Sequence, residues 1–201
     1  SCTCLAFWGE TLHIQNMFVD NIRIFARAGK GGNGLVSFRR AKFVPKGGPD
    51  GGDGGDGGSV ILEVDPHTND LRSFFYDPKL IATDGVGGQS AKKHGKNGKS
   101  VIGKVPPGTI IYRSNASSMA EATWLEREGE GIELEKIADL TEIGTRFTLC
   151  QGGIGGKGNW HFRSATNQAP TEAEMGTEGE EGVFFMELRR IADAGLVGYP
   201  N

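Results

Sequence analysis

The stretch "GGPDGGDGGDGGSV", residues 47–60, decides the fold of this chain, because it has almost no side chain that could enter an apolar core. Aspartate returns at every third place, at Asp50, Asp53 and Asp56. A period of three is that of the polyproline II helix, which rises about 3.1 Å per residue and has no internal hydrogen bonds. Glycine on two of three faces lets such helices approach closely and exchange backbone hydrogen bonds and Cα–H···O contacts. The structural glycines of this interpretation are Gly47, Gly48, Gly51, Gly52, Gly54, Gly55, Gly57 and Gly58.

An array of glycine helices cannot support itself. Ordering one backbone residue costs roughly 1 to 2 kcal/mol, and more for glycine, whereas a Cα–H···O contact returns about 0.5 to 1 kcal/mol. We therefore expect strands to fix both ends of every glycine segment. The three aspartates are expected to line the remaining face of their helix, in water.

Two other interpretations of the stretch are open from the sequence. Composition alone is also typical of a flexible linker, although linkers favour serine and have no strict period. The nonapeptide of calcium-binding β-rolls matches Gly51, Gly52, Gly54 and Asp56. Its apolar position falls on Gly58, however, and no tandem copy follows.

Short strands surround the glycine clusters. Apolar residues alternate with period two at 18–29, 59–65, 99–113, 144–153 and 182–195. Further glycine clusters lie between these segments, at 28–34, 85–98 and 152–159. The pattern predicts a mainly β fold, a small barrel or sandwich, with one short helix at 117–131.

Composition excludes several classes of protein. The chain has 33 glycines among 201 residues and is 37% hydrophobic, so its apolar core must be modest. No apolar run is long enough for a spanning helix, and residues 1–16 lack the basic and apolar regions of a signal peptide. We expect a cytoplasmic protein without a membrane partner. Cys2, Cys4 and Cys150 have no zinc-site spacing, so reduced thiols and no metal site are expected.

Charge is distributed unevenly. The net charge is −3, but residues 17–113 carry 15 Lys and Arg against 9 Asp and Glu, whereas residues 114–201 carry 7 against 15. This asymmetry indicates a polyanionic partner for the first half. Basic side chains with interleaved aromatics, as in "FRRAKFVPKGG" at 38–48, suit RNA phosphates and unstacked bases.

Three basic clusters lie beside glycine-rich turns, and an ordinary solvated surface is the alternative to an RNA site. The candidate RNA-binding residues are Arg39, Arg40, Lys42, Lys46, Lys92, Lys93, Lys96, Lys99, Lys157 and Arg163. His94 and His161 have no metal-ligand spacing and are expected to be surface or hydrogen-bonded histidines.

The segment "FVDNIRIFARAGKGGNGLVSFRRAKFVPKGGPDGGDGGDGGSVIL", residues 18–62, closely resembles the N-terminal domain of the Obg GTPases, bacterial and organellar ribosome-assembly factors. "VPPGTIIY", "GGIGGKGNWHF", "TNQAP" and "GEEG" resemble later landmarks of that domain, in order. The resemblance implies the Obg fold, in which left-handed glycine-rich type II (polyproline-like) helices project from an eight-stranded β-barrel. The strand count comes from the family and not from composition.

The resemblance implies a division of the chain and three departures from the family. Residues 17–188 would form the Obg domain and 189–201 the start of a truncated GTPase domain. Residues 1–16 would be a leader or a cloning-derived extension, and about 114–136 a surface insertion. Trp160 stands where the family has a small residue.

The last residues bear on catalysis. The P-loop pattern is G-x-x-x-x-G-K-[ST], and its first four positions match Gly198, Tyr199, Pro200 and Asn201. The lysine and Ser/Thr of that pattern are not in the chain. The resemblance therefore implies a parent protein that binds GTP and Mg²⁺ and hydrolyses GTP, while this chain has no catalytic residue and no cofactor of its own.

Two functions follow from the sequence. The resemblance implies an RNA-contacting module that binds the large ribosomal subunit, with the glycine helices reaching toward its peptidyl-transferase region. The alternative is a protein-interaction domain in stress or growth signalling, in which the acidic half contacts regulatory protein partners.

Overall fold

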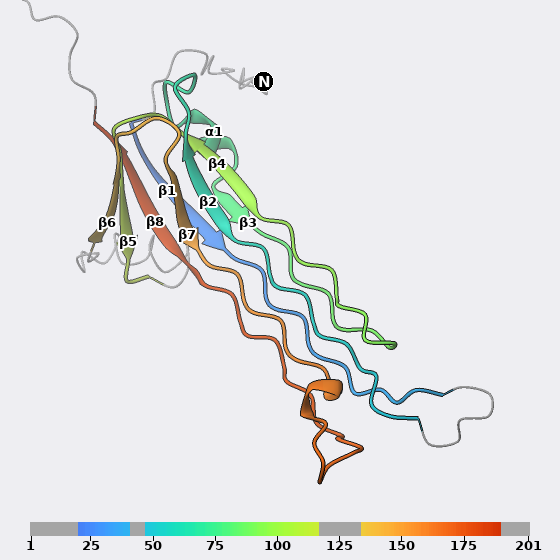
Figure 1. Cartoon of the computed structure of the whole chain (residues 1–201). Coiled ribbons are helices and arrows are strands. Elements are labelled where there is room, and N and C mark those ends of the chain that lie inside the picture. Colours follow the sequence, from blue (N-terminus) through green and yellow to red (C-terminus); the bar gives the residue numbers. More distant parts are fainter. Residues whose placement is uncertain (1–19, 41–46, 117–133, 190–201) are drawn as a thin grey trace, which may run out of the picture.

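The structure is a computed structural model that describes residues 20–40, 47–116 and 134–189, and it is mainly β (Figure 1). One sheet has five strands, in the order β3 (Lys79–Ile81), β1 (Asn21–Arg27), β8 (Glu181–Leu188), β5 (Thr109–Ser114) and β6 (Leu134–Leu140). The other has three, in the order β4 (Val101–Val105), β2 (Val60–Val64) and β7 (Arg146–Cys150). Two short helices accompany them, α1 (Arg72–Tyr76) and the 3-10 helix η2 (Asn159–Phe162).

The strands form where the sequence alternates. In β1, Ile24 and Ala26 are fully buried and Arg27 is exposed, because successive side chains point to opposite faces. Each segment predicted from period two contains a strand of the structure. Strands β3 and β6 were not predicted, since β3 has three residues and β6 buries only Leu140. The helix predicted at 117–131 lies outside the described residues.

The two sheets share one apolar core. Its residues come from both sheets and include Ile24, Leu62, Val105, Leu149 and Phe184. Within the described residues, the four outer strands β3, β6, β4 and β7 pair on one side only. Hydrogen bonds therefore do not close the sheets into the barrel that the resemblance predicts, and side-chain packing joins them instead.

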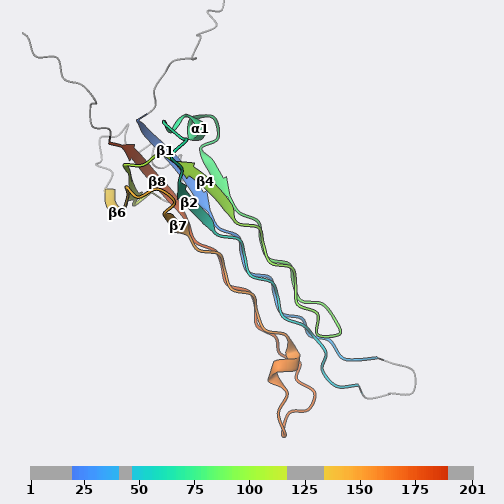
Figure 2. The same cartoon turned by 45° about the horizontal axis from the view of Figure 1, so that its top comes forward.

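Six of the strands continue into glycine-rich segments, which form three arms that run side by side away from the sheets (Figures 1 and 2). Arm 1 consists of residues 28–35 and 50–58, between β1 and β2. Arm 2 consists of 82–89 and 92–100, between β3 and β4. Arm 3 consists of 151–158 and 174–180, between β7 and β8. A strand thus holds one end of each segment, and not both ends as predicted, because the other end leads into a loop at the far end of the arm.

Backbone hydrogen bonds join these segments at every third residue. Within arm 1, the N–H groups of Gly29, Gly32 and Leu35 donate to the carbonyls of Gly58, Gly55 and Gly52, at 2.8, 2.8 and 3.1 Å. Between arms 1 and 2, the N–H groups of Gly52, Gly55 and Gly58 donate to Gln89, Val86 and Thr83, at 2.8, 2.8 and 2.9 Å. The glycine segments are thus an ordered bundle, which excludes the flexible linker.

Close approach of the backbones explains the glycines. A Cβ atom on Gly54 would lie 1.9 Å from the carbonyl oxygen of Gly32, and one on Gly88 would lie 2.0 Å from that of Gly52. Gly87 differs, because a Cβ atom there would lie 3.4 Å from its nearest neighbour, the carbonyl oxygen of Asn33. The glycine requirement therefore depends on which face of a segment meets another backbone.

The three aspartates were expected to line a face in water. Asp56 is exposed and Asp50 and Asp53 are half-buried, and all three carboxylates also accept hydrogen bonds from backbone amides. Asp53 Oδ1 accepts from the N–H of Gly158 at 2.7 Å, and Asp56 Oδ1 accepts from the N–H of Gly155 at 2.9 Å. Asp50 Oδ2 accepts from the N–H of Ala91 at 3.3 Å. Amide groups that face no carbonyl of another segment need an acceptor, and these carboxylates supply it.

Candidate nucleic-acid interface

The free ends of the arms carry three loops, which we call the tip. They are the described residues 36–40 and 47–49 between the halves of arm 1, which we call the arm 1 loop, the turn at 89–93, and the segment from η2 to residue 173. The N–H of Asp50 donates to the carbonyl of Ser37 at 2.9 Å, and its carbonyl accepts from the N–H of Lys92 at 2.7 Å. Asp50 thereby joins the arm 1 loop to the turn of arm 2.

The predicted basic clusters converge in one pocket, which we call the tip pocket. Its volume is about 430 Å³, and its lining residues are Arg39, Gly48, Pro49, Asp50, Ala91, Lys92 and Arg163. Arg39, Lys92 and Arg163 come from the three loops, one from each predicted cluster. Arg39 and Arg163 are more than 120 positions apart in the sequence, and they line one pocket because the arms that carry them run side by side and end together.

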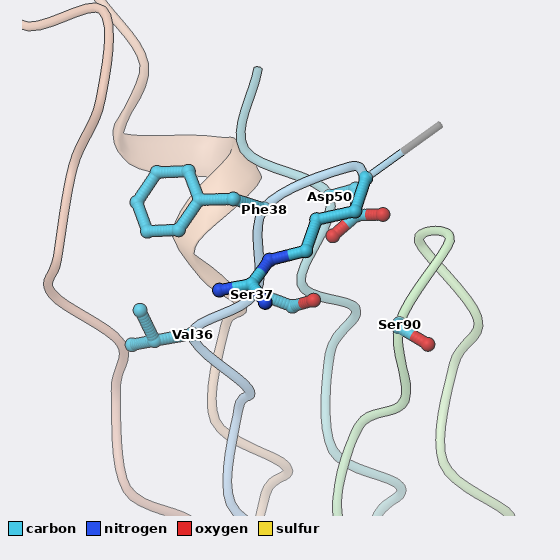
Figure 3. Close-up of a pocket in the computed structure, with 6 residues that line it drawn as sticks. Val36, Ser37, Phe38, Asp50 and Ser90 are labelled. Carbon is cyan, nitrogen blue, oxygen red and sulfur yellow. The ribbon is translucent and has the colours of Figure 1, made fainter. Parts of the chain in front are cut away.

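A second pocket adjoins the first, and Asp50 lines both. Its lining residues are Val36, Ser37, Phe38, Arg40, Asp50 and Ser90. In Figure 3, Ser90 lies on the turn of arm 2, and the other labelled residues lie on arm 1 and its loop. Arg40 therefore lies next to the tip pocket.

The other predicted basic residues lie along the arms. Lys93, Lys96 and Lys99 form a row of exposed side chains on the outer segment of arm 2, three residues apart. Backbone hydrogen bonds join that segment to residues 50–59 and 83–89. Segment 174–180 makes its backbone hydrogen bonds to arm 1 and to segment 151–158, and it carries Glu174, Glu178 and Glu180. A basic edge and an acidic edge thus lie on opposite sides of the bundle. Lys157 is exposed on arm 3.

Some predicted residues lie outside the described part of the chain. These are Lys42, Lys46, Gly198, Tyr199, Pro200 and Asn201.

The turn of arm 2 has an unusual backbone. Ala91 and Lys92 have φ values of 61° and 57°, in the left-handed region that non-glycine residues rarely adopt. Positive φ at both central residues is typical of a type I′ turn, which favours Asn-Gly. The N–H of Gln89 closes the turn on the carbonyl of Lys93 at 3.0 Å. The N–H of Lys92 donates to the backbone carbonyl of Asp50, and the N–H of Ala91 donates to its carboxylate. These two hydrogen bonds hold the strained residues in place.

Asn159 anchors η2 to the arms, a role that the sequence did not reveal. Its side chain is fully buried, and Oδ1 accepts from the N–H of Gly51 at 2.9 Å. Its Nδ2 donates to the carbonyls of Ser37 and Pro170, at 3.1 and 3.0 Å. One amide therefore joins three parts of the tip, and nothing in a lone "NW" dipeptide would indicate this.

His161 is an exposed and hydrogen-bonded histidine, as expected. Its Nε2 lies 2.8 Å from Asp53 Oδ2, and the Asp53 carboxylate also accepts from Gly158. Burial alone would raise the pKa of Asp53, but the Gly158 bond, the His161 bond and the charges of His161 and His94 outweigh it and lower that pKa. The pair ties the loop of arm 3 to arm 1.

Trp160 places an indole beside the tip pocket. The ammonium of Lys92 lies 4.9 Å from the centroid of the Trp160 ring, in cation–π geometry. The ring of His161 lies 3.9 Å from the same indole, centroid to centroid. A cation, an aromatic platform and two arginines therefore occur together at the end of the bundle.

No helix in the described ranges is long and apolar enough to cross a membrane. The family model described as GTP1/OBG matches residues 19–190. The chain is similar to three proteins named GTPase Obg. It is 49% identical over 187 residues to one from Methylacidiphilum infernorum (isolate V4), covering 92% of this chain and 51% of the relative.

The second, from Chlorobium chlorochromatii (strain CaD3), is 50% identical over 184 residues, with 92% and 49% covered. The third, from Clostridioides difficile (strain 630), is 48% identical over 185 residues, with 92% and 40% covered. The chain spans about half the length, or less, of these curated relatives. The extent of the family match and the identity of these relatives show that the chain belongs to the GTP1/OBG family, as an Obg-type N-terminal domain.

Proposed function

We propose that this chain is the RNA-contacting module of an Obg-type GTPase and that it binds ribosomal RNA of the large subunit during subunit assembly. One observation carries the proposal, namely the convergence of Arg39, Lys92 and Arg163 at the free end of the bundle. Phosphate contacts by Arg and Lys supply most of the affinity of proteins for RNA and fix their orientation.

The form of the bundle supports this function. Where glycines face a neighbouring segment, no side chain separates the two backbones, so the segments pack closely and the arms are narrow relative to their length. Hydrogen bonds at every third residue support our proposal that each segment is a left-handed polyproline-like helix, with the two sheets corresponding to the eight-stranded barrel of the family. A narrow and ordered rod can enter a groove of structured RNA that a helix with outward side chains could not.

The longer protein is proposed to be a cytoplasmic GTPase that uses GTP and Mg²⁺. The names of the relatives support the GTPase assignment. In the proposed division, 17–188 form the Obg domain, 189–201 lead into the GTPase domain, and 1–16 and about 114–136 are an extension and an insertion.

Co-sedimentation of the 201-residue chain with purified large ribosomal subunits, over a series of salt concentrations, tests the proposal. We expect saturable binding that weakens as salt rises, because each neutralised phosphate releases counterions. The variant Arg39→Glu/Arg163→Glu should abolish most of this binding. Lys79→Glu/Arg113→Glu makes the same change of charge at exposed strand residues and should retain it.

Equal loss of binding in the two double variants would contradict a site at the tip. Binding that does not depend on salt would favour the alternative, a protein-interaction domain. The acidic edge gives that alternative less support, because Glu178 pairs with Lys30, while Glu180 and Glu174 accept from the N–H groups of Gln151 and Lys157.

A further inference from the structure

We propose that the tip pocket binds one nucleotide of a single-stranded RNA segment, with its phosphate held by Arg39, Lys92 and Arg163 and its base stacked on Trp160. This inference rests on the proposed function and specifies the part of the RNA that the tip contacts.

The charges of the pocket favour a phosphate. Arg39, Lys92 and Arg163 line it from three separate loops, and Asp50 is the one acid among the described residues that line it. Cations brought together repel one another, and a bound anion removes that cost. The two arginines present planar donors that match phosphate oxygens in pairs.

Asp50 offsets part of the positive charge of the pocket. Its Oδ2 accepts from the N–H of Ala91, and its Oδ1 is shielded, so Oδ1 is not open to a ligand. The groups of the pocket that favour a phosphate are therefore the three cations.

Trp160 supplies the platform for the base. Its indole is partly exposed, and Lys92 Nζ covers the ring at 4.9 Å from the centroid. A stacked base would take the place of this ammonium, and the flexible lysine stem would let Nζ turn to the phosphate. The hydrogen bond from the Lys92 N–H to the Asp50 carbonyl holds the backbone of Lys92, so this movement would need the side chain alone.

Fluorescence titration of the 201-residue chain with a short single-stranded oligoadenylate tests the inference. Subtracting the signal of Trp160→Phe isolates Trp160 from Trp8 and Trp124. We expect a saturable change that Trp160→Phe lacks. Fluorescence anisotropy of a dye-labelled oligoadenylate, which does not depend on Trp160, should show that Trp160→Phe still binds and that Trp160→Ala binds about tenfold more weakly.

A lysine on a strand is the matched control. Lys92→Gln should make the plot of log affinity against log salt shallower by about 0.7, the value for one phosphate contact on a single strand. Lys79→Gln removes the same charge at an exposed residue of β3, outside the predicted basic clusters, and should leave the slope unchanged.

Three results would overturn the inference. Equal slopes for the two lysine variants would indicate non-specific attraction, and tighter binding of AMP than of oligoadenylate would assign the pocket to a free nucleotide. Loss of subunit binding in Trp160→Ala without any response to oligoadenylate would assign it to a protein. If the wild-type chain binds large subunits but Trp160 never responds, this inference alone fails and the proposed function stands.

Discussion

Gly87 and Gly88 are neighbours in arm 2, yet only Gly87 has room for a side chain. A methyl group on Gly88 would meet the carbonyl of Gly52, whereas one on Gly87 makes an ordinary contact. We expect Gly88→Ala to lower stability by about 1 to 3 kcal/mol, because backbone must shift. Gly87→Ala should raise stability by about 0.4 to 1 kcal/mol by restricting the unfolded chain. Urea unfolding of both variants checks this, and equal effects would contradict the close packing of the arms.

Asp53 makes the stability of the tip depend on pH. Its folded pKa lies below the ordinary value of 3.8, so its contribution is fully present above that pH and is lost as the pH falls through the folded value. Asp53→Asn should therefore reduce Tm at neutral pH and flatten the decline of Tm on acidification. Thermal melts of both proteins between about pH 2 and 7 measure this. Parallel curves would show that the carboxylate carries no such linkage.

At the scale of elements, the turn of arm 2 stores backbone strain. Ala91 has a φ of 61°, and asparagine tolerates this conformation better than alanine. We expect Ala91→Asn to raise the free energy of unfolding by about 1 kcal/mol. Ser90→Asn, at a neighbouring residue without positive φ, should give no such gain. If both variants gain equally in urea unfolding, the increase does not come from the left-handed backbone.

The sequence predicted those elements that carry a local signal. Alternating apolar residues identified β1, β2, β4, β5, β7 and β8. The period of three identified one glycine segment, at 50–58, and glycine content indicated those at 28–34, 85–98 and 152–159. Edge strands such as β6 bury too few side chains to leave a pattern. The hydrogen bonds of Asp53 and Asp56 were not predicted, because their partners lie about 100 positions away in the sequence. These partners are the N–H groups of Gly158 and Gly155, and glycine has no side chain that would indicate them.

At the scale of the whole molecule, the candidate site is a product of topology. Family resemblance and charge indicated Arg39, Lys92 and Arg163, but not that they share one pocket. The arms associate through backbone hydrogen bonds, which every residue type can make. A glycine-rich sequence therefore does not indicate which segments lie next to one another. The cation–π contact of Lys92 with Trp160 has the same origin, since it depends on arms 2 and 3 ending together.

The bundle depends on the core from which it projects, because its contacts alone do not repay the ordering of its glycines. Phe184 is 2% exposed and packs between the sheets, so Phe184→Ala should cost about 3 to 5 kcal/mol. If arms and sheets unfold as one unit, the amides of Gly32 and Gly55 should lose hydrogen-exchange protection together with those of β1 and β8. Hydrogen exchange by NMR at increasing urea compares them. If the free energy of opening is much lower for the glycine amides than for the strand amides, the arms open without the core, and the two do not form one cooperative unit.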